Sequence, residues 1–127
     1  MKVLGMSWVG VKTSDFARSR TFFSEVMGLA FSYERADFAM VRLPDGDKFE
    51  LFGPEGPDPE PQFRNNAVVA GFWVDDFEGA REELRASGAE LLGEVKGDPG
   101  GYRWQHFRAP DGKVFELISE PARPRPR

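Results

Sequence analysis

The sequence contains no cysteine and a single histidine, His106, and these scarcities exclude several classes of site. Without cysteine there can be no disulfide scaffold, no thiolate metal site and no cysteine nucleophile. With one histidine, a single chain cannot build an iron site of two histidines and one carboxylate, or an HExxH zinc site, unless subunits share ligands. A serine–histidine–aspartate triad would have to use His106.

The chain also lacks a long apolar run and an excess of basic residues. No stretch of about 18 apolar residues occurs, so no membrane-spanning helix is predicted. No secretory signal is visible, and we expect a cytoplasmic protein. The net charge is −4, and residues 120–127 contribute +2, so residues 1–119 carry −6. An acidic body disfavours nucleic acid as a partner and allows a neutral or cationic small ligand.

Proline is concentrated in two places. Four of the ten prolines lie in the segment 53–61, and three lie after Glu120. Proline-rich stretches of this kind favour extended segments outside a core. We therefore expect a first module over 1–53, a connector over 54–66, a second module over 67–119 and a disordered tail over 120–127, all within one structural domain.

The two modules repeat one another. Residues 42–52 (RLPDGDKFELF) match residues 108–118 (RAPDGKVFELI) at seven of eleven positions, with an offset of 66. Upstream, residues 8–16 (WVGVKTSDF) match residues 69–77 (VAGFWVDDF) with an offset of 61. Because the matched blocks occur in the same order, one supersecondary unit is used twice.

Each unit is predicted to be βαβββ. Alternating and helical patterns of apolar residues place the elements. The predicted strands are 7–13, 30–34, 38–43 and 47–52 in the first module and 67–74, 91–95, 102–109 and 113–119 in the second. The helices are predicted to start at a polar cap and to end at a glycine: Ser14 or Asp15 and Gly28 in the first, Asp75 or Asp76 and Gly88 in the second.

The repeated Pro-Asp-Gly turn sets the register of each hairpin. A three-residue loop with glycine in its left-handed position pairs Met40 with Glu50 and His106 with Glu116 on one face. That face mixes charged and aromatic side chains, which is typical of a ligand cavity, although a polar solvent-exposed face is the alternative. The candidate cavity residues on the hairpins are Phe38, Met40, Arg42, Glu50, Phe52, Trp104, His106, Arg108 and Glu116.

The first strand of the second module adds further candidates. Alternation puts Val69, Gly71 and Trp73 on the cavity side. Trp73 is either a ligand-binding residue or a packing or dimer residue. Glycine at position 71, as at the matching Gly10, allows close approach of a backbone or ligand. The glycine-rich segment 96–102 is interpreted as a mobile rim over the pocket.

The text Trp8-Val-Gly-Val-Lys-Thr-Ser-Asp-Phe16 and the hairpin Pro110-Asp-Gly-Lys-Val-Phe-Glu-Leu117 resemble the vicinal oxygen chelate superfamily, from about Val3 to Ser119. This superfamily includes glyoxalase I, fosfomycin resistance proteins, extradiol dioxygenases and bleomycin resistance proteins. The resemblance implies an α+β fold of two tandem βαβββ modules that form a curved mixed β-sheet cleft with flanking helices. It also implies a homodimer.

The resemblance further implies a divalent metal (Mg, Mn, Zn, Ni or Fe) held between the modules. The corresponding positions here are Trp8, Glu50, Val69 and Glu116. The carboxylates Glu50 and Glu116 can ligate a metal, whereas indole and isopropyl groups cannot. His106 either adds a third ligand or only hydrogen-bonds Glu116 and orients it. The expected site is thus incomplete, and we expect no cofactor.

Three functions are compatible with these residues. The first is binding of a small molecule in an aromatic, acidic cleft without a metal, sequestering a drug or metabolite as bleomycin resistance proteins do; Trp8 then joins the ligand-binding set. The second is a metal-dependent lyase, isomerase or dioxygenase that uses Glu50, Glu116 and His106, with Glu116 and His106 as catalytic residues. The third is a non-catalytic interaction protein. We expect the first.

Overall fold

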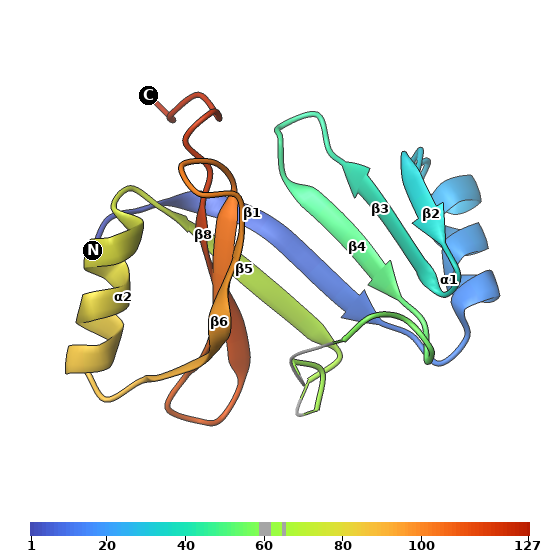
Figure 1. The fold of residues 1–127 in the computed structure, drawn as a ribbon. Coiled ribbons are helices and arrows are strands. Elements are labelled where there is room, and N and C mark those ends of the chain that lie inside the picture. Colours follow the sequence, from blue (N-terminus) through green and yellow to red (C-terminus); the bar gives the residue numbers. More distant parts are fainter. Residues whose placement is uncertain (59–61, 65) are drawn as a thin grey trace.

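The computed structural model describes residues 1–58, 62–64 and 66–127 and contains one eight-stranded mixed sheet (Figure 1). The strand order is β2-β3-β4-β1-β5-β8-β7-β6. The strands are β1 (Val3–Lys12), β2 (Tyr33–Arg35), β3 (Phe38–Arg42), β4 (Lys48–Phe52), β5 (Val68–Val74), β6 (Glu90–Gly97), β7 (Arg103–Arg108) and β8 (Val114–Ser119). The helices are α1 (Phe16–Thr21), its π-helical continuation η1 (Phe22–Val26) and α2 (Phe77–Ala86).

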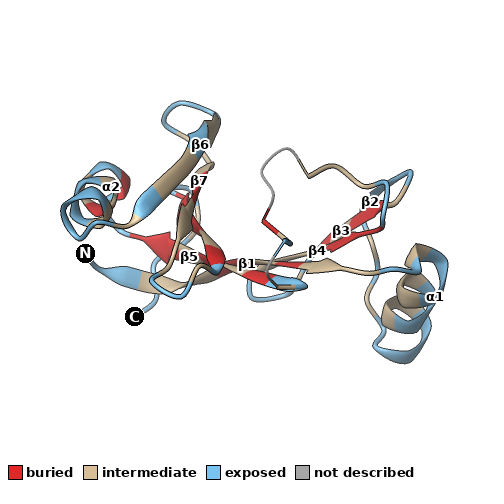
Figure 2. Cartoon of the chain, turned by 90° about the horizontal axis from the view of Figure 1, so that it is seen from below, coloured by how far each residue is buried: buried red, intermediate tan, exposed pale blue. Residues whose placement is uncertain are grey.

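The sheet confirms the duplication. In each module the first strand pairs in parallel with the last, β1 with β4 and β5 with β8, and the last strand pairs with its hairpin partner. The modules join where β1 and β5 pair antiparallel, so one chain forms a continuous curved sheet. One helix lies toward each end of this sheet (Figure 2). This is the predicted α+β fold of two tandem βαβββ modules.

Both hairpins have the predicted register. Met40 stands opposite Glu50, and His106 stands opposite Glu116. The backbone N–H of Leu43 donates to Asp47 O at 2.7 Å, and that of Ala109 donates to Lys113 O at 2.8 Å. The turn glycines have φ values of +96° and +92°, the left-handed conformation that a three-residue loop requires.

The helix caps confirm the second candidate of each pair. The Asp15 carboxylate accepts from the N–H of Arg18 at 3.1 Å, and that of Asp76 accepts from Gly79 at 3.0 Å. The terminal glycines Gly28 and Gly88 have φ values of +76° and +86°. The first helix differs from expectation, because its last turn widens: Met27 N–H donates to the carbonyl five residues earlier.

Two apolar clusters lie in the modules. Phe77 and Ala80 of α2 pack with Val74 and Leu117. The second cluster, here called the seam cluster, lies where the two modules meet. Its buried members are Trp8, Phe38, Phe52, Val69 and Ile118. Buried residues accordingly follow the central strands (Figure 2). Neither helix in the described ranges is long and apolar enough to cross a membrane.

Candidate functional site

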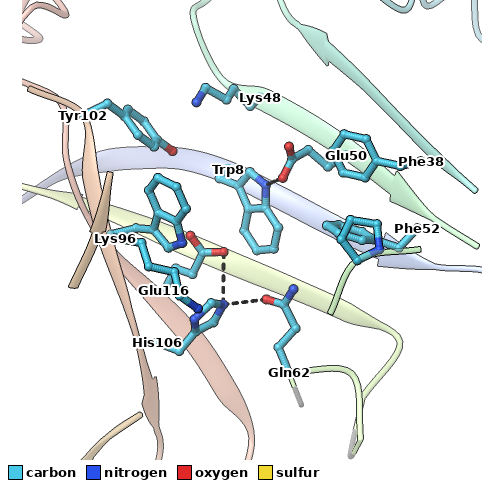
Figure 3. Close-up of a pocket in the computed structure, with 12 residues that line it drawn as sticks. Trp8, Phe38, Lys48, Glu50, Phe52, Gln62, Lys96, Tyr102, His106 and Glu116 are labelled. Atoms are coloured by element: carbon cyan, nitrogen blue, oxygen red, sulfur yellow. Dashed lines mark hydrogen bonds and ion pairs between the residues drawn. The ribbon is translucent and has the colours of Figure 1, made fainter. Parts of the chain in front are cut away.

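A cavity lies between the two modules (Figure 3). Three members of the seam cluster, Trp8, Phe38 and Phe52, form part of its wall. The empty space within the cavity, together with its open mouth, amounts to about 630 Å³. Strands of both modules and the connector line it, so a single chain supplies a cleft. The described lining residues are Trp8, Phe38, Lys48, Glu50, Phe52, Pro57, Gln62, Lys96, Tyr102, Trp104, His106 and Glu116.

Trp8 occupies the centre of the cleft. Trp8 is only 3 % exposed, and its ring packs edge-on against that of Phe52 with 6.5 Å between the ring centroids. The indole N–H donates a hydrogen bond to the Oε1 of Glu50 on β4 (Figure 3). The first strand of the module therefore supplies a proton donor to a carboxylate, where a metal site would need a lone pair.

The glycine at position 10 makes room for this indole. A Cβ built on Gly10 would lie 2.3 Å from the Trp8 ring, a clash that no small adjustment relieves. The space at this position is taken by side chains, chiefly the Trp8 ring of the same strand, and not by another backbone. At the matching Gly71 the neighbour is Ile118, whose Cδ1 would lie 2.4 Å from an added Cβ.

Burial governs the ionisation of Glu50. Loss of water raises the pKa of this carboxyl above its usual value, and the nearby Glu116 carboxylate raises it further. The Trp8 hydrogen bond and the positive charge of Lys48 lower the pKa in opposition, and burial is the largest influence. Glu50 is therefore easier to protonate than a solvent-exposed glutamate.

Glu116 has different partners from Glu50. Nε2 of His106 lies 2.8 Å from Oε1 of Gln62 and 3.4 Å from Oε2 of Glu116 (Figure 3). His106 and Glu116 are only 4 % and 5 % exposed. His106 thus lies between the Glu116 carboxylate and Gln62 of the connector.

Lys48 and Tyr102 approach each other across the cleft at the end opposite Gln62 (Figure 3). The Lys48 ammonium lies 3.5 Å from the centroid of the Tyr102 ring, a cation–π contact between the two modules. Burial, and secondarily the charge of Arg42, lower the pKa of Lys48. Burial likewise raises the pKa of the Tyr102 hydroxyl, so it remains a neutral hydrogen-bonding group at this rim.

Seven of the predicted site residues line the cleft, and five do not. Arg42 and Arg108 instead bind their own hairpin turns, donating to the carbonyls of Gly46 at 2.6 Å and Gly112 at 3.1 Å. Both arginines lie at the turn end of their strands, and these bonds hold the guanidinium groups at the turns. The lining residues foreseen from the sequence are Trp8, Phe38, Glu50, Phe52, Trp104, His106 and Glu116.

The other three candidates, Val69, Met40 and Trp73, do not line the cleft either. Val69 is fully buried beneath Trp8, and Met40 packs against the same seam cluster. Trp73 lies further along β5, where its ring meets the guanidinium of Arg123 at 4.7 Å. This arginine belongs to the segment expected to be a disordered tail.

Five lining residues were not foreseen: Lys48, Pro57, Gln62, Lys96 and Tyr102. Lys48 shares the strand face of Glu50, so the hairpin register contained a usable signal for it. The predicted rim segment 96–102 contains Lys96 and Tyr102. Pro57 and Gln62 belong to the connector, where no periodicity says which side chain turns inward.

The donor set does not fit the divalent metal that the resemblance implies. Of the four corresponding positions, Trp8 presents only an N–H donor, and it is directed at Glu50. Val69 is apolar and fully buried. Within the ranges 1–58, 62–64 and 66–127, no three histidine, aspartate or glutamate side chains gather in a group able to hold a metal ion.

Solved structures share this fold. A superfamily member from Vibrio splendidus 12B01 is 24 % identical, with a TM-score of 0.64, and the match covers 88 % of this chain and 96 % of that one. Methylmalonyl-CoA epimerase from Mycobacterium tuberculosis is 18 % identical, with a TM-score of 0.69 and coverage of 93 % and 89 %. The Mn(II)-bound glyoxalase from Novosphingobium aromaticivorans is 24 % identical, with a TM-score of 0.73 and coverage of 99 % and 42 %.

No match was found among curated proteins. The family model described as Glyoxalase/Bleomycin resistance protein/Dioxygenase superfamily matches residues 5–117, which include both modules and the connector. With this match over the full duplicated unit, the chain belongs to the glyoxalase/bleomycin resistance protein/dioxygenase superfamily.

Proposed function

We propose that this protein binds an organic small molecule in the cleft between its modules without a metal ion. The hydrogen bond from the Trp8 indole to Glu50 carries the proposal. Because of this bond, an aromatic ring and a carboxylate that already accepts a hydrogen bond occupy two of the positions that the family resemblance assigns to metal ligands. Binding without turnover would sequester a drug or metabolite.

The cleft chemistry suits a flat apolar compound with one hydrogen-bond-donating or cationic group. Trp8, Trp104 and Phe52 supply aromatic walls. The Glu116 carboxylate, held by His106, supplies an acceptor at the connector end. Aromatic faces attract cations, and a carboxylate of low exposure strengthens that preference. Lys48 and Lys96 also line the cleft. The position of each charged side chain, rather than the net charge of the lining, therefore selects the ligand.

A matched ligand series tests this proposal. Calorimetric titration with 2-naphthylmethylamine, 2-naphthalenemethanol and 2-naphthoic acid keeps the ring and changes only the charge. We expect saturable binding of the amine in the presence of EDTA, with weaker binding of the alcohol and the acid. Glu116→Gln should weaken the amine about fivefold and the alcohol less than about twofold.

Glu94→Gln is the matched control, because Glu94 is exposed, lies outside the cleft lining and loses the same negative charge. Both ligands should bind this variant as they bind the wild type. If none of the three compounds binds saturably, the proposal fails; preferential binding of the acid would reverse the assigned polarity.

A second candidate is an enzyme, and the contact between His106 and Glu116 favours it. A buried imidazole beside a carboxylate can hold and move a proton. As a metal-dependent lyase, isomerase or dioxygenase, the protein would use Glu116, His106 and Glu50. Elemental analysis of the purified protein tests this: a stoichiometric divalent ion that is lost in Glu116→Ala would replace the first proposal.

The homodimer expected from the sequence is a separate proposal, because one chain supplies all described lining residues of the cleft. Strands β2 and β6 form the two outer edges of the sheet, and an exposed edge favours pairing with another chain. Light scattering during size-exclusion chromatography should give twice the monomer mass; a monomer mass would remove this proposal.

A further inference from the structure

The segment after β8 returns to the sheet and inserts one arginine between the modules. Residues 120–127 and the hairpin loop 43–47 lie at the same end of the sheet, away from the connector (Figure 1). The side chain of Arg123 is only 14 % exposed. An arginine so shielded needs several acceptors to replace its water.

Arg123 has those acceptors on both of its terminal nitrogens. Nη2 donates to the Asp47 carboxylate at 2.7 Å and to the carbonyl of Asp45 at 2.9 Å. Nη1 donates to the carbonyl of Met6 at 3.1 Å and lies 3.5 Å from Oε2 of Glu120. The face of the guanidinium lies over the ring of Trp73, with 4.7 Å to the centroid.

These partners come from both modules. Met6 lies on β1, and Asp45 and Asp47 lie in the loop between β3 and β4, so they belong to the first module. Trp73 lies on β5, and Glu120 directly follows β8 in the second. We propose that this end of the sheet is a built guanidinium-binding site, occupied by the chain's own Arg123, which clasps the two modules together.

The geometry selects a guanidinium over an ammonium. The planar fork of arginine reaches acceptors on two sides and stacks on an aromatic face at once, whereas a lysine ammonium is a compact point charge. The turn glycine leaves space for the fork: a Cβ on Gly46 would lie 3.1 Å from Nε of Arg123.

Through Glu120, the clasp also contacts the residue that precedes Trp8 on β1. Glu120, which is buried, accepts from Ser7 Oγ at 2.7 Å and from Arg42 Nη1 at 3.0 Å as well as from Arg123. Ser7 is fully buried and directly precedes Trp8 on β1. Loss of the clasp should therefore loosen the strand that carries the central ring of the cleft.

Chemical rescue in the full-length chain tests the site. Arg123→Ala should lower Tm by about 6 °C, because it leaves the acceptors and the Trp73 face without their partner. Millimolar ethylguanidinium should restore at least half of that loss, while ethylammonium at the same concentration should restore little. Arg127→Ala is the matched control, since it removes the same charge from an exposed position of the same segment.

Asp47→Asn provides a second variant in case Arg123→Ala does not fold. It keeps Arg123 and removes one charged acceptor, so we expect a smaller loss of Tm and no rescue by ethylguanidinium. The double variant should lose less than the sum of the single losses, because the two residues act through one contact. Equal rescue by ethylammonium, an equal effect of Arg127→Ala, or additive losses would each overturn the proposal.

Discussion

The last strands of the two modules carry the same Phe-Glu-Leu text, yet their glutamates have different neighbours. Glu50 accepts from the indole N–H of Trp8, on the first strand of its own module. Glu116 lies beside His106, which comes from its hairpin partner and also meets Gln62 of the connector. The repeat therefore reproduces the backbone position of the carboxylate, while residues that differ between the two modules decide which groups surround it.

The equivalent first-strand positions explain the difference. Trp8 donates its indole N–H to Glu50, whereas Val69, its counterpart, is apolar and fully buried. Valine has no hydrogen-bond donor in its side chain, and Glu116 instead lies beside His106 of the neighbouring strand. The comparison shows that one substitution between equivalent first-strand positions gives equivalent carboxylates different surroundings.

The largest test of this asymmetry is removal of the Trp8 ring. Trp8→Ala should lower the free energy of unfolding by about 4 kcal/mol, because a buried ring is lost and Glu50 loses its donor. Urea titration measures the change. Val69→Ala, the equivalent substitution in the other module, should cost about 1.5 kcal/mol, since only two methyl groups are removed. Equal losses at the two positions would contradict the comparison.

Removal of the imidazole tests the other carboxylate. His106→Ala should cost about 2 kcal/mol at neutral pH, because the buried Glu116 and Gln62 lose the polar neighbour that they share. His106→Gln, whose amide can still donate, is the control and should recover part of the loss in the same urea titration. A loss below about 0.5 kcal/mol for His106→Ala would show that Glu116 does not depend on this contact.

The pH dependence of stability should separate Glu50 from its counterpart. The pKa of Glu50 is raised on folding, chiefly by burial, so its contribution is fully present below the pKa of the unfolded chain. That contribution is lost as the pH rises through the folded pKa. Glu50→Gln should therefore match the wild type at acidic pH and become the more stable of the two as the pH rises through the folded pKa.

Denaturation curves collected across this pH range measure the effect of Glu50→Gln. The glutamine keeps an acceptor for the Trp8 N–H, so the hydrogen bond is preserved in the comparison. Should the variant lose stability relative to the wild type as the pH rises, the carboxylate of Glu50 would be stabilised by its surroundings rather than penalised by burial.

The smallest expected difference lies in the helix caps. Asp76→Ala should cost about 1 kcal/mol, because it removes the cap of α2, whose first turn packs Phe77 into the core. Asp15→Ala should cost about 0.5 kcal/mol, because α1 buries no residue and has only six residues. Thermal unfolding of the two variants compares them, and a larger loss at Asp15 would reverse the order.

Local patterns were sufficient to predict most of the fold. The Pro-Asp-Gly turns set the pairing of Met40 with Glu50 and of His106 with Glu116, because a three-residue loop allows one register. The aspartate caps and terminal glycines marked both helices. The widened turn η1 was not predictable, since a π-helical turn shares the apolar spacing of an α-helix within one turn.

The candidate site was predictable on strands and not on loops. Alternation assigns a strand residue to a face, and it therefore found Trp104, Glu50 and Glu116. It does not report depth, so Val69 and Met40 share the predicted face without lining the cleft. Gln62 and Arg123 lie outside strands, and only long-range contacts bring them to His106 and Trp73.

By itself, the sequence determined the duplicated βαβββ unit, its hairpin registers and the helix caps, because turn chemistry, alternation and residue type are local properties. The tertiary structure alone decided that both modules form one cleft within a chain, that Trp8 donates to Glu50, and that Arg123 joins the modules. These features depend on contacts between residues far apart in the chain, which the curvature of the shared sheet brings together.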